Sequence, residues 1–118
     1  MALSDLGPFA DAALLIMGSL ADGPKHGYAM LDDIELLAGV RMGPGTLYTT
    51  LARLQQRGWV EALPADERRH PYRLTGAGRI MLRDQLLRLE GFATAGLRRM
   101  GETIPGVGPV AAAEGMAQ

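Results

Sequence analysis

The sequence predicts a mainly α-helical fold with one small two-stranded β-hairpin. Two observations support this: apolar residues recur at helical spacing in four segments, and a polar turn separates two short strand-like runs. Of the 118 residues, 47% are hydrophobic and 5% are aromatic, which is enough apolar material to bury one core. The length fits one compact domain with a helical extension.

The first two predicted helices differ in how their apolar residues are arranged. The first begins at Pro8, where the missing N–H costs little, and residues 12–17 are apolar nearly all round, as in a helix central to a bundle. It ends near residues 22–24, and the second helix then runs to Gly39. The second helix is amphipathic, with acidic residues on one side and these apolar residues on the other: Tyr28, Met30, Leu31, Ile34 and Leu37.

The third predicted helix covers residues 44–57 and has two unlike faces. Leu47, Leu51 and Leu54 gather on one side and are expected to face a core. The other side carries short hydroxyls and guanidiniums without a bulky apolar residue: Thr46, Thr49, Thr50, Arg53 and Arg57. This second face suits contact with a polar partner.

A hairpin and a long helix complete the predicted elements. Residues 59–62 and 71–74 predict two strands joined by the polar loop 64–70, which carries Arg68 and Arg69 at its tip. Thr75 is expected to cap a fourth helix that continues to Met100. The glycine, alanine and proline residues of 101–118 predict a flexible tail.

The fourth predicted helix has two apolar stripes. Ile80 and Leu87 lie nearly opposite a seam that follows alternating steps of four and three residues: Leu82, Leu86, Leu89, Ala93, Gly96 and Met100. One small domain cannot bury opposite faces of one helix, so we infer a homodimer that packs on the seam. The alternative is that the first helix of the same chain covers both stripes.

Three helices followed by a hairpin is the order of a winged helix-turn-helix, in which the third helix enters the major groove of DNA and the hairpin loop lies on the backbone. The charges agree with this assignment. Residues 1–40 hold one lysine and six acids, whereas residues 41–74 hold six arginines and three acids. We therefore predict a DNA-binding domain (1–74) for double-stranded DNA, a dimerisation helix (75–100) and the tail (101–118).

Other functional classes find little support. There is no cysteine and only two histidines, which argues against a metal site, a cofactor or a nucleophilic enzyme. The longest apolar run is far shorter than the roughly 18 residues of a membrane span, and no secretory signal is evident. The expectation is a cytoplasmic protein without a membrane partner.

Four strings together resemble the PadR-like transcriptional regulators: LLIMGSLADGPKHGY from residue 14, PGTLY from residue 44, LARLQQRGWV from residue 51, and YRLTGAG from residue 72. The resemblance implies a dimeric winged-helix repressor whose C-terminal helix forms the dimer. Lys25, His26 and Tyr28 match the start of the family's second helix, which lies against the DNA backbone. Thr46 and Tyr48 match its groove-helix motif.

Two departures leave the operator undetermined, because the family often has serine where Gly43 stands and a second proline where Thr49 stands. The resemblance also implies that some members bind an inducer in an apolar space between the dimer's helices. Residues that suit such a small hydrophobic effector are Phe9, Met81, Phe92 and Met100, although methionine and phenylalanine at helical spacing also suit a core.

Several residues keep two interpretations. His26 either contacts the DNA backbone or fixes the turn before the second helix, and Tyr48 either reaches a phosphate or packs under the wing. Arg73 either contacts DNA or pairs with Glu61 across the hairpin, and Trp59 is expected in the core. The predicted function is a repressor that binds a pseudo-palindromic operator. The alternative is a protein-interaction module without DNA binding, using the acidic side of the second helix.

Overall fold

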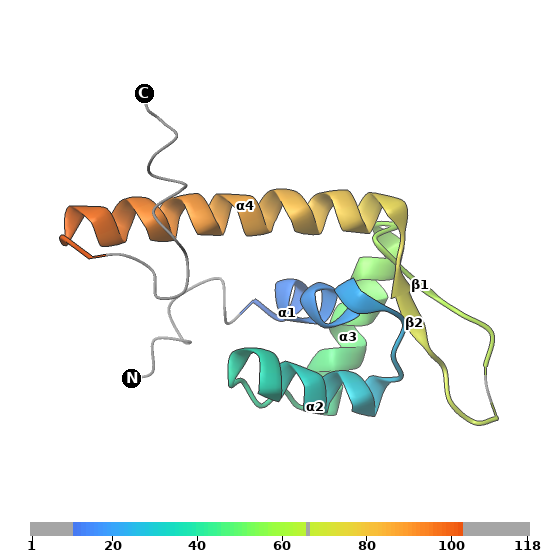
Figure 1. Ribbon diagram of the computed structural model, residues 1–118. Helices are drawn as coiled ribbons and strands as arrows, with labels where there is room; N and C mark the ends of the chain where they lie inside the picture. The colour runs from blue at the N-terminus through green and yellow to red at the C-terminus, as the bar shows by residue number, and fades with distance from the viewer. Residues whose placement is uncertain (1–10, 66, 103–118) are drawn as a thin grey trace. The chain divides into compact units, whose positions relative to one another are not determined.

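The computed structural model describes residues 11–65 and 67–102. Its elements are α1 (Ala12–Ser19), the short 3-10 helix η3 (Leu20–Asp22), α2 (Gly27–Ala38), α3 (Pro44–Gln56), β1 (Val60–Ala62), β2 (Tyr72–Leu74) and α4 (Gly76–Arg99) (Figure 1). The described residues divide into two compact units between Leu82 and Arg83, and α4 contributes to both. The predicted fold class, a mainly helical winged helix-turn-helix with a two-stranded hairpin, is confirmed.

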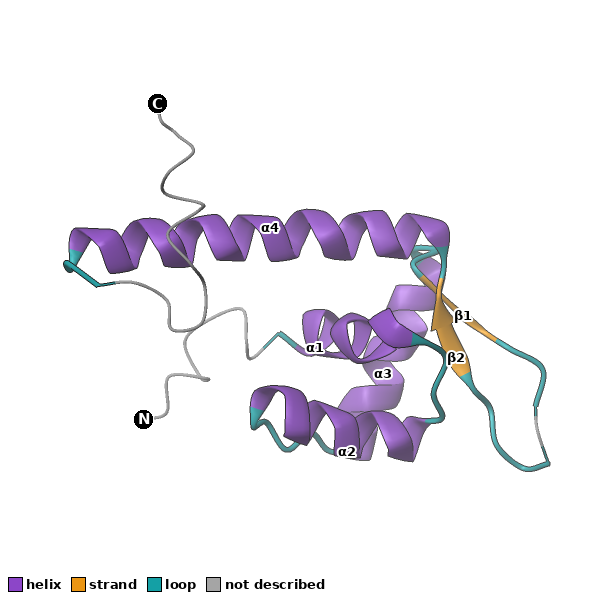
Figure 2. Cartoon of the chain, viewed as in Figure 1, coloured by secondary structure: helices purple, strands orange, loops and turns teal. Residues whose placement is uncertain are grey.

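Helix α1 begins at Ala12, later than the start predicted from Pro8, which lies outside the described residues. The reason is Asp11, which is extended and whose carboxylate accepts a 2.9 Å hydrogen bond from the Ala13 N–H. Helix α1 packs against both α2 and α3, which explains why its apolar residues nearly surround it (Figure 2).

Helices α2 and α3 bury narrower faces. Helix α2 buries Met30 and Ile34 and ends at Gly39, whose φ of 69° is left-handed. The predicted apolar side of α2 was too wide, because Tyr28 and Leu37 are 72% and 61% exposed. Helix α3 places its three leucines in the core as predicted: Leu47, Leu51 and Leu54.

The hairpin joins the core through one residue of each strand. β1 and β2 pair antiparallel, and Val60 lies opposite Leu74 with both side chains buried. Glu61 lies opposite Arg73 and forms a 2.5 Å ion pair with it, so the cross-strand interpretation of Arg73 is confirmed. Lys25 adds an antiparallel bridge to Tyr72 that was not predicted from the sequence, because a single paired residue leaves no periodic signal.

The start of α4 is fixed on the hairpin. The Thr75 hydroxyl accepts a 3.0 Å hydrogen bond from the Gly78 N–H and donates a 2.6 Å one to the Gly58 carbonyl, so the predicted cap is confirmed. Leu82 is 3% exposed in the core of this first unit, and Met81 packs against the same core. Leu82 is therefore a core residue of its own chain, unlike the rest of the predicted dimer seam.

The second unit contains the remainder of α4. Among its described side chains, Leu86, Leu87, Phe92 and Met100 are exposed. Ala93 is also exposed, whereas Leu89 and Gly96 are half-buried. None of the described helices has the length and apolar content needed to cross a membrane.

Candidate nucleic-acid interface

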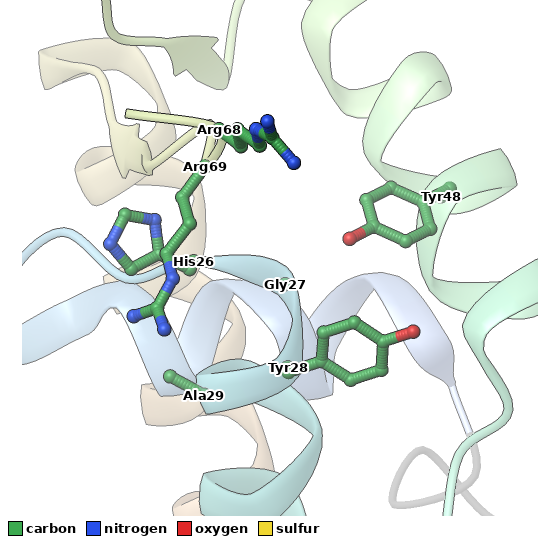
Figure 3. Close-up of a pocket in the computed structure, with 7 residues that line it drawn as sticks. All are labelled: His26, Gly27, Tyr28, Ala29, Tyr48, Arg68 and Arg69. Atoms are coloured by element: carbon green, nitrogen blue, oxygen red, sulfur yellow. The ribbon is translucent and has the colours of Figure 1, made fainter. Parts of the chain in front are cut away.

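The start of α2, one residue of α3 and the hairpin loop border one hollow of about 370 Å³ (Figure 3). Its lining combines backbone, hydroxyl, imidazole and guanidinium groups: His26, Gly27, Tyr28, Ala29, Tyr48, Arg68 and Arg69. All but Gly27 and Ala29 were singled out from the sequence. The fold thus gathers predicted residues from three separate segments.

The first turn of α2 faces this hollow with its backbone donors. His26 is the N-cap residue in extended conformation, and its side chain makes no capping hydrogen bond. Its ring atom Nδ1 is buried and finds no hydrogen-bond partner among the described residues. Uncapped N–H groups and the positive end of the helix dipole attract an anion.

Tyr48 reaches across to this helix start. A Cβ placed on Gly27 would lie 2.8 Å from Tyr48 Cζ and would overlap the Tyr48 hydroxyl, so the ring depends on glycine here. Figure 3 shows the Tyr48 hydroxyl pointing from α3 towards Gly27. Burial, and secondly the electrostatic effect of nearby Tyr48, raises the pKa of Tyr72 above its usual 10.0.

Arg68 and Arg69 bring positive charge from the hairpin loop. Both are exposed, and neither forms an ion pair with an acid in the described part of the chain. In Figure 3 the Arg68 side chain extends towards Tyr48. Backbone N–H groups, a phenol and two guanidiniums are donors that suit a phosphate group.

Lys25 does not line this hollow, and its side chain contacts other residues of its own chain. Its ammonium donates to the Ser19 carbonyl, lies 2.5 Å from Asp22 and 3.7 Å from Asp33, and is 18% exposed. The hydrogen bond from Lys25, and secondly its charge, lowers the pKa of Asp22. The Lys25 side chain therefore neutralises acids of its own chain, while its backbone exchanges two hydrogen bonds with Tyr72 of β2.

Helix α3 presents a second surface around its outward face. Thr46, Thr49, Arg53 and Arg57 are exposed as predicted, whereas Thr50 is half-buried. Gln55 and Gln56 are also exposed, although the sequence pattern did not single them out. A helical wheel centred opposite the three leucines points at Gln56 as well as Thr49, so this signal was available.

The proposed effector residues are divided by the fold. Met81 packs against the core of the first unit, while Phe92 and Met100 are 80% and 71% exposed in the second. Phe9 lies outside the described residues. An apolar space between two chains therefore stays a prediction.

The fold and this surface define a winged helix-turn-helix protein with a polar, cationic recognition side. The chain belongs to the PadR-like family of transcriptional regulators, whose family model matches residues 16–84. It is also 49% identical over 72 residues to an uncharacterised 37.1 kDa protein in a transposon of Streptomyces fradiae. That match covers 61% of this chain but only 21% of the relative, so this chain spans about a fifth of that protein.

Solved structures share the fold. A PadR family transcription regulator from Clostridium difficile has a TM-score of 0.66 at 19% identity, covering 75% of this chain and 96% of that one. A transcriptional regulator from Clostridium thermocellum has a TM-score of 0.65 at 24% identity, covering 73% and 86%. RosR from H. salinarum has a TM-score of 0.56 at 28% identity, covering 75% and 77%.

Proposed function

We propose that this protein is a sequence-specific DNA-binding repressor that acts as a homodimer. Helix α3 enters the major groove, and the loop of residues 64–70 lies on the flanking backbone. The observation that carries the proposal is the hollow of about 370 Å³, where α2, α3 and the hairpin loop converge. A backbone phosphate fits its chemistry, because the lining offers the guanidinium donors of Arg68 and Arg69, two tyrosine hydroxyls that can donate, and the N–H groups at the start of α2.

The groups that line the hollow come from different elements and are proposed to contact the phosphate from different sides. The start of α2 offers backbone N–H groups from a rigid element, while Arg68 and Arg69 approach from the loop. Tyr48 connects this phosphate site to the groove helix. Contacts to phosphate fix the register of the protein on the duplex and leave base selection to the outward face of α3.

The dimer is proposed from the apolar side chains of α4. In the second unit Leu86 and Phe92 are 47% and 80% exposed, which a single chain in water does not favour. Packing α4 on a second copy covers them and repeats α3 by two-fold symmetry, with half-sites about 34 Å apart. A small hydrophobic effector between the chains acts by favouring one dimer geometry over the other.

A salt-dependent titration tests the proposal. The full chain is titrated into a labelled duplex from the region upstream of its own gene and into a scrambled duplex of equal composition. We expect tighter binding to the first duplex and a steep fall in affinity with salt. Equal affinity for both duplexes contradicts sequence-specific binding.

One observation favours a second candidate, a protein-interaction module. Leu36 is 86% exposed on α2, beside Leu37 and near the exposed acids Asp32 and Glu35. An apolar pair among acids suits a basic, amphipathic protein partner. Replacing Arg68 with alanine separates the candidates, because it weakens DNA binding and leaves a partner on α2 unaffected.

A further inference from the structure

Helix α3 carries donor groups on both of its flanks. Tyr48 lies on the flank that borders the first hollow, and Arg53, five residues later, lies about 140° around the helix. Thr46 and Arg57 lie on the same side as Arg53. The middle of the outward face falls between these flanks, at Thr49 and Gln56, which are seven residues apart and only about 20° from each other.

The second flank also borders a hollow, of about 430 Å³, beside the first turn of α1. It is lined by Asp11, Ala12, Ala13, Thr46, Thr50, Arg53, Leu54, Arg57 and Trp59. The two guanidiniums and two threonine hydroxyls outnumber the single carboxylate of Asp11. Asp11 itself caps α1 through Ala13, so attraction for an anion comes from the arginines and not from that helix start.

Arg57 is held in place at this hollow. Its guanidinium lies 5.3 Å from the centre of the Trp59 ring, and Trp59 is half-buried against the core. A cation over an aromatic face loses little freedom when it binds a phosphate. This gives Trp59 a positioning role in addition to the core role expected from the sequence.

We infer that the second hollow binds a backbone phosphate of the opposite DNA strand, so that α3 is clamped between the two strands that border one major groove. The inference rests on the proposed function. An α-helix with its side chains is about 10–12 Å wide and the major groove about 12 Å, so the two flanks of α3 face the two backbones. Arg53 and Arg57 then anchor the protein, and Thr49 and Gln56 read bases.

The assignment is tested with the full chain on the two duplexes used above, one from upstream of its own gene and one scrambled. Removing a phosphate contact weakens binding to every sequence and lowers the salt slope, whereas removing a base contact weakens only the specific duplex. We compare Arg57→Gln with Gln56→Ala. Arg79→Gln is the control with the same charge loss, because Arg79 lines neither hollow and donates to the Ala21 carbonyl.

We expect Arg57→Gln to weaken both duplexes by a similar factor, roughly tenfold, and to reduce the salt slope by about two for the dimer. Gln56→Ala should weaken the specific duplex alone by roughly tenfold and leave the slope unchanged. Asp11→Asn, which keeps a capping side chain, should tighten both duplexes. Thermal unfolding confirms that each variant is folded.

Two results overturn the inference while leaving the proposed function standing. One is an Arg57→Gln variant that loses only specific binding with its slope intact, which makes Arg57 a base-reading residue. The other is an Arg57→Gln variant whose affinities and salt slopes on both duplexes equal those of Arg79→Gln. That result would mean that Arg57 does not contact DNA. A wild-type protein that does not prefer its own upstream duplex overturns the proposed function itself.

Discussion

Gly27 is the residue on which the geometry of the first hollow depends. A methyl group there would lie 2.8 Å from Tyr48 Cζ and 3.3 Å from Leu47, so the Tyr48 ring must move. We expect Gly27→Ala to reduce the free energy of unfolding by about 1–3 kcal/mol, as is usual for overpacking. Urea denaturation measures this loss.

A double-mutant cycle isolates the cause. In a Tyr48→Ala background the added methyl group no longer meets the ring, so Gly27→Ala should cost less there than in the wild type. An equal cost in both backgrounds would mean that Tyr48 is not what excludes a side chain at this position.

Asp22 gives a pH dependence at the residue scale. Its pKa is lowered below the usual 3.8 by the hydrogen bond and charge of Lys25, so the folded state holds the proton less tightly than the unfolded chain. Its contribution to stability is complete above the unfolded pKa and is lost as the pH falls through the lowered one. We expect Asp22→Asn to lower the urea midpoint at neutral pH, with the difference from wild type vanishing in strong acid. A difference that persists there excludes ionisation as its source.

At the scale of elements, the junction between the hairpin and α4 depends on Gly78. A Cβ on Gly78 would lie 2.8 Å from the Trp59 carbonyl carbon, and backbone cannot move aside as a side chain can. Gly78→Ala should therefore destabilise the protein by about 1–3 kcal/mol.

Gly76 provides the matched control. It begins the same helix, and a Cβ there meets nothing within 4 Å. Gly76→Ala should be neutral or stabilising by up to about 1 kcal/mol, because alanine favours the helix. Thermal unfolding of both variants tests the pair, and equal effects would contradict the packing argument.

The elements were predictable where the physical signal is local. The helix end at Gly39, the helix cap at Thr75 and the leucine spacing of α3 follow from backbone preference, side-chain capping and periodicity, and the structure agrees with them. The start of α1 was misplaced because proline is one of several helix-start signals and the aspartate cap prevailed. The Lys25 bridge to Tyr72 depends on contacts between distant segments, which no periodic pattern records.

The candidate site was likewise predictable only in those features that depend on local sequence. A helical wheel predicts which residues are polar and outward on α3 and on which flank each one lies, but it does not predict which element packs beside each flank. Tyr48 lines a hollow with the start of α2, while Arg53 and Arg57 line another hollow with the start of α1. Lys25 matched a family motif, yet its charge serves Asp22 and Asp33. Such assignments require the tertiary contacts.

At the scale of the whole molecule, the proposed dimer makes α4 the element that sets operator affinity. Leu86 on the seam and Leu87 on the opposite stripe are 47% and 53% exposed within one chain. Replacing either one with glutamate should therefore change the stability of the single chain by about the same amount. Only an interface distinguishes them. We expect Leu86→Glu to raise the dimer dissociation constant roughly thirtyfold or more, corresponding to about 2 kcal/mol, and Leu87→Glu to change it much less.

Sedimentation at several protein concentrations measures this difference, and DNA titration extends it to function. A monomer places one α3 in one groove, so Leu86→Glu should lose affinity for a duplex with two half-sites while its affinity for a single half-site stays near that of the wild type. Dissociation by Leu87→Glu alone would move the dimer seam to the stripe of Ile80 and Leu87. If neither variant dissociates the protein, α4 does not hold the two copies together, and the spacing of about 34 Å between half-sites loses its physical basis.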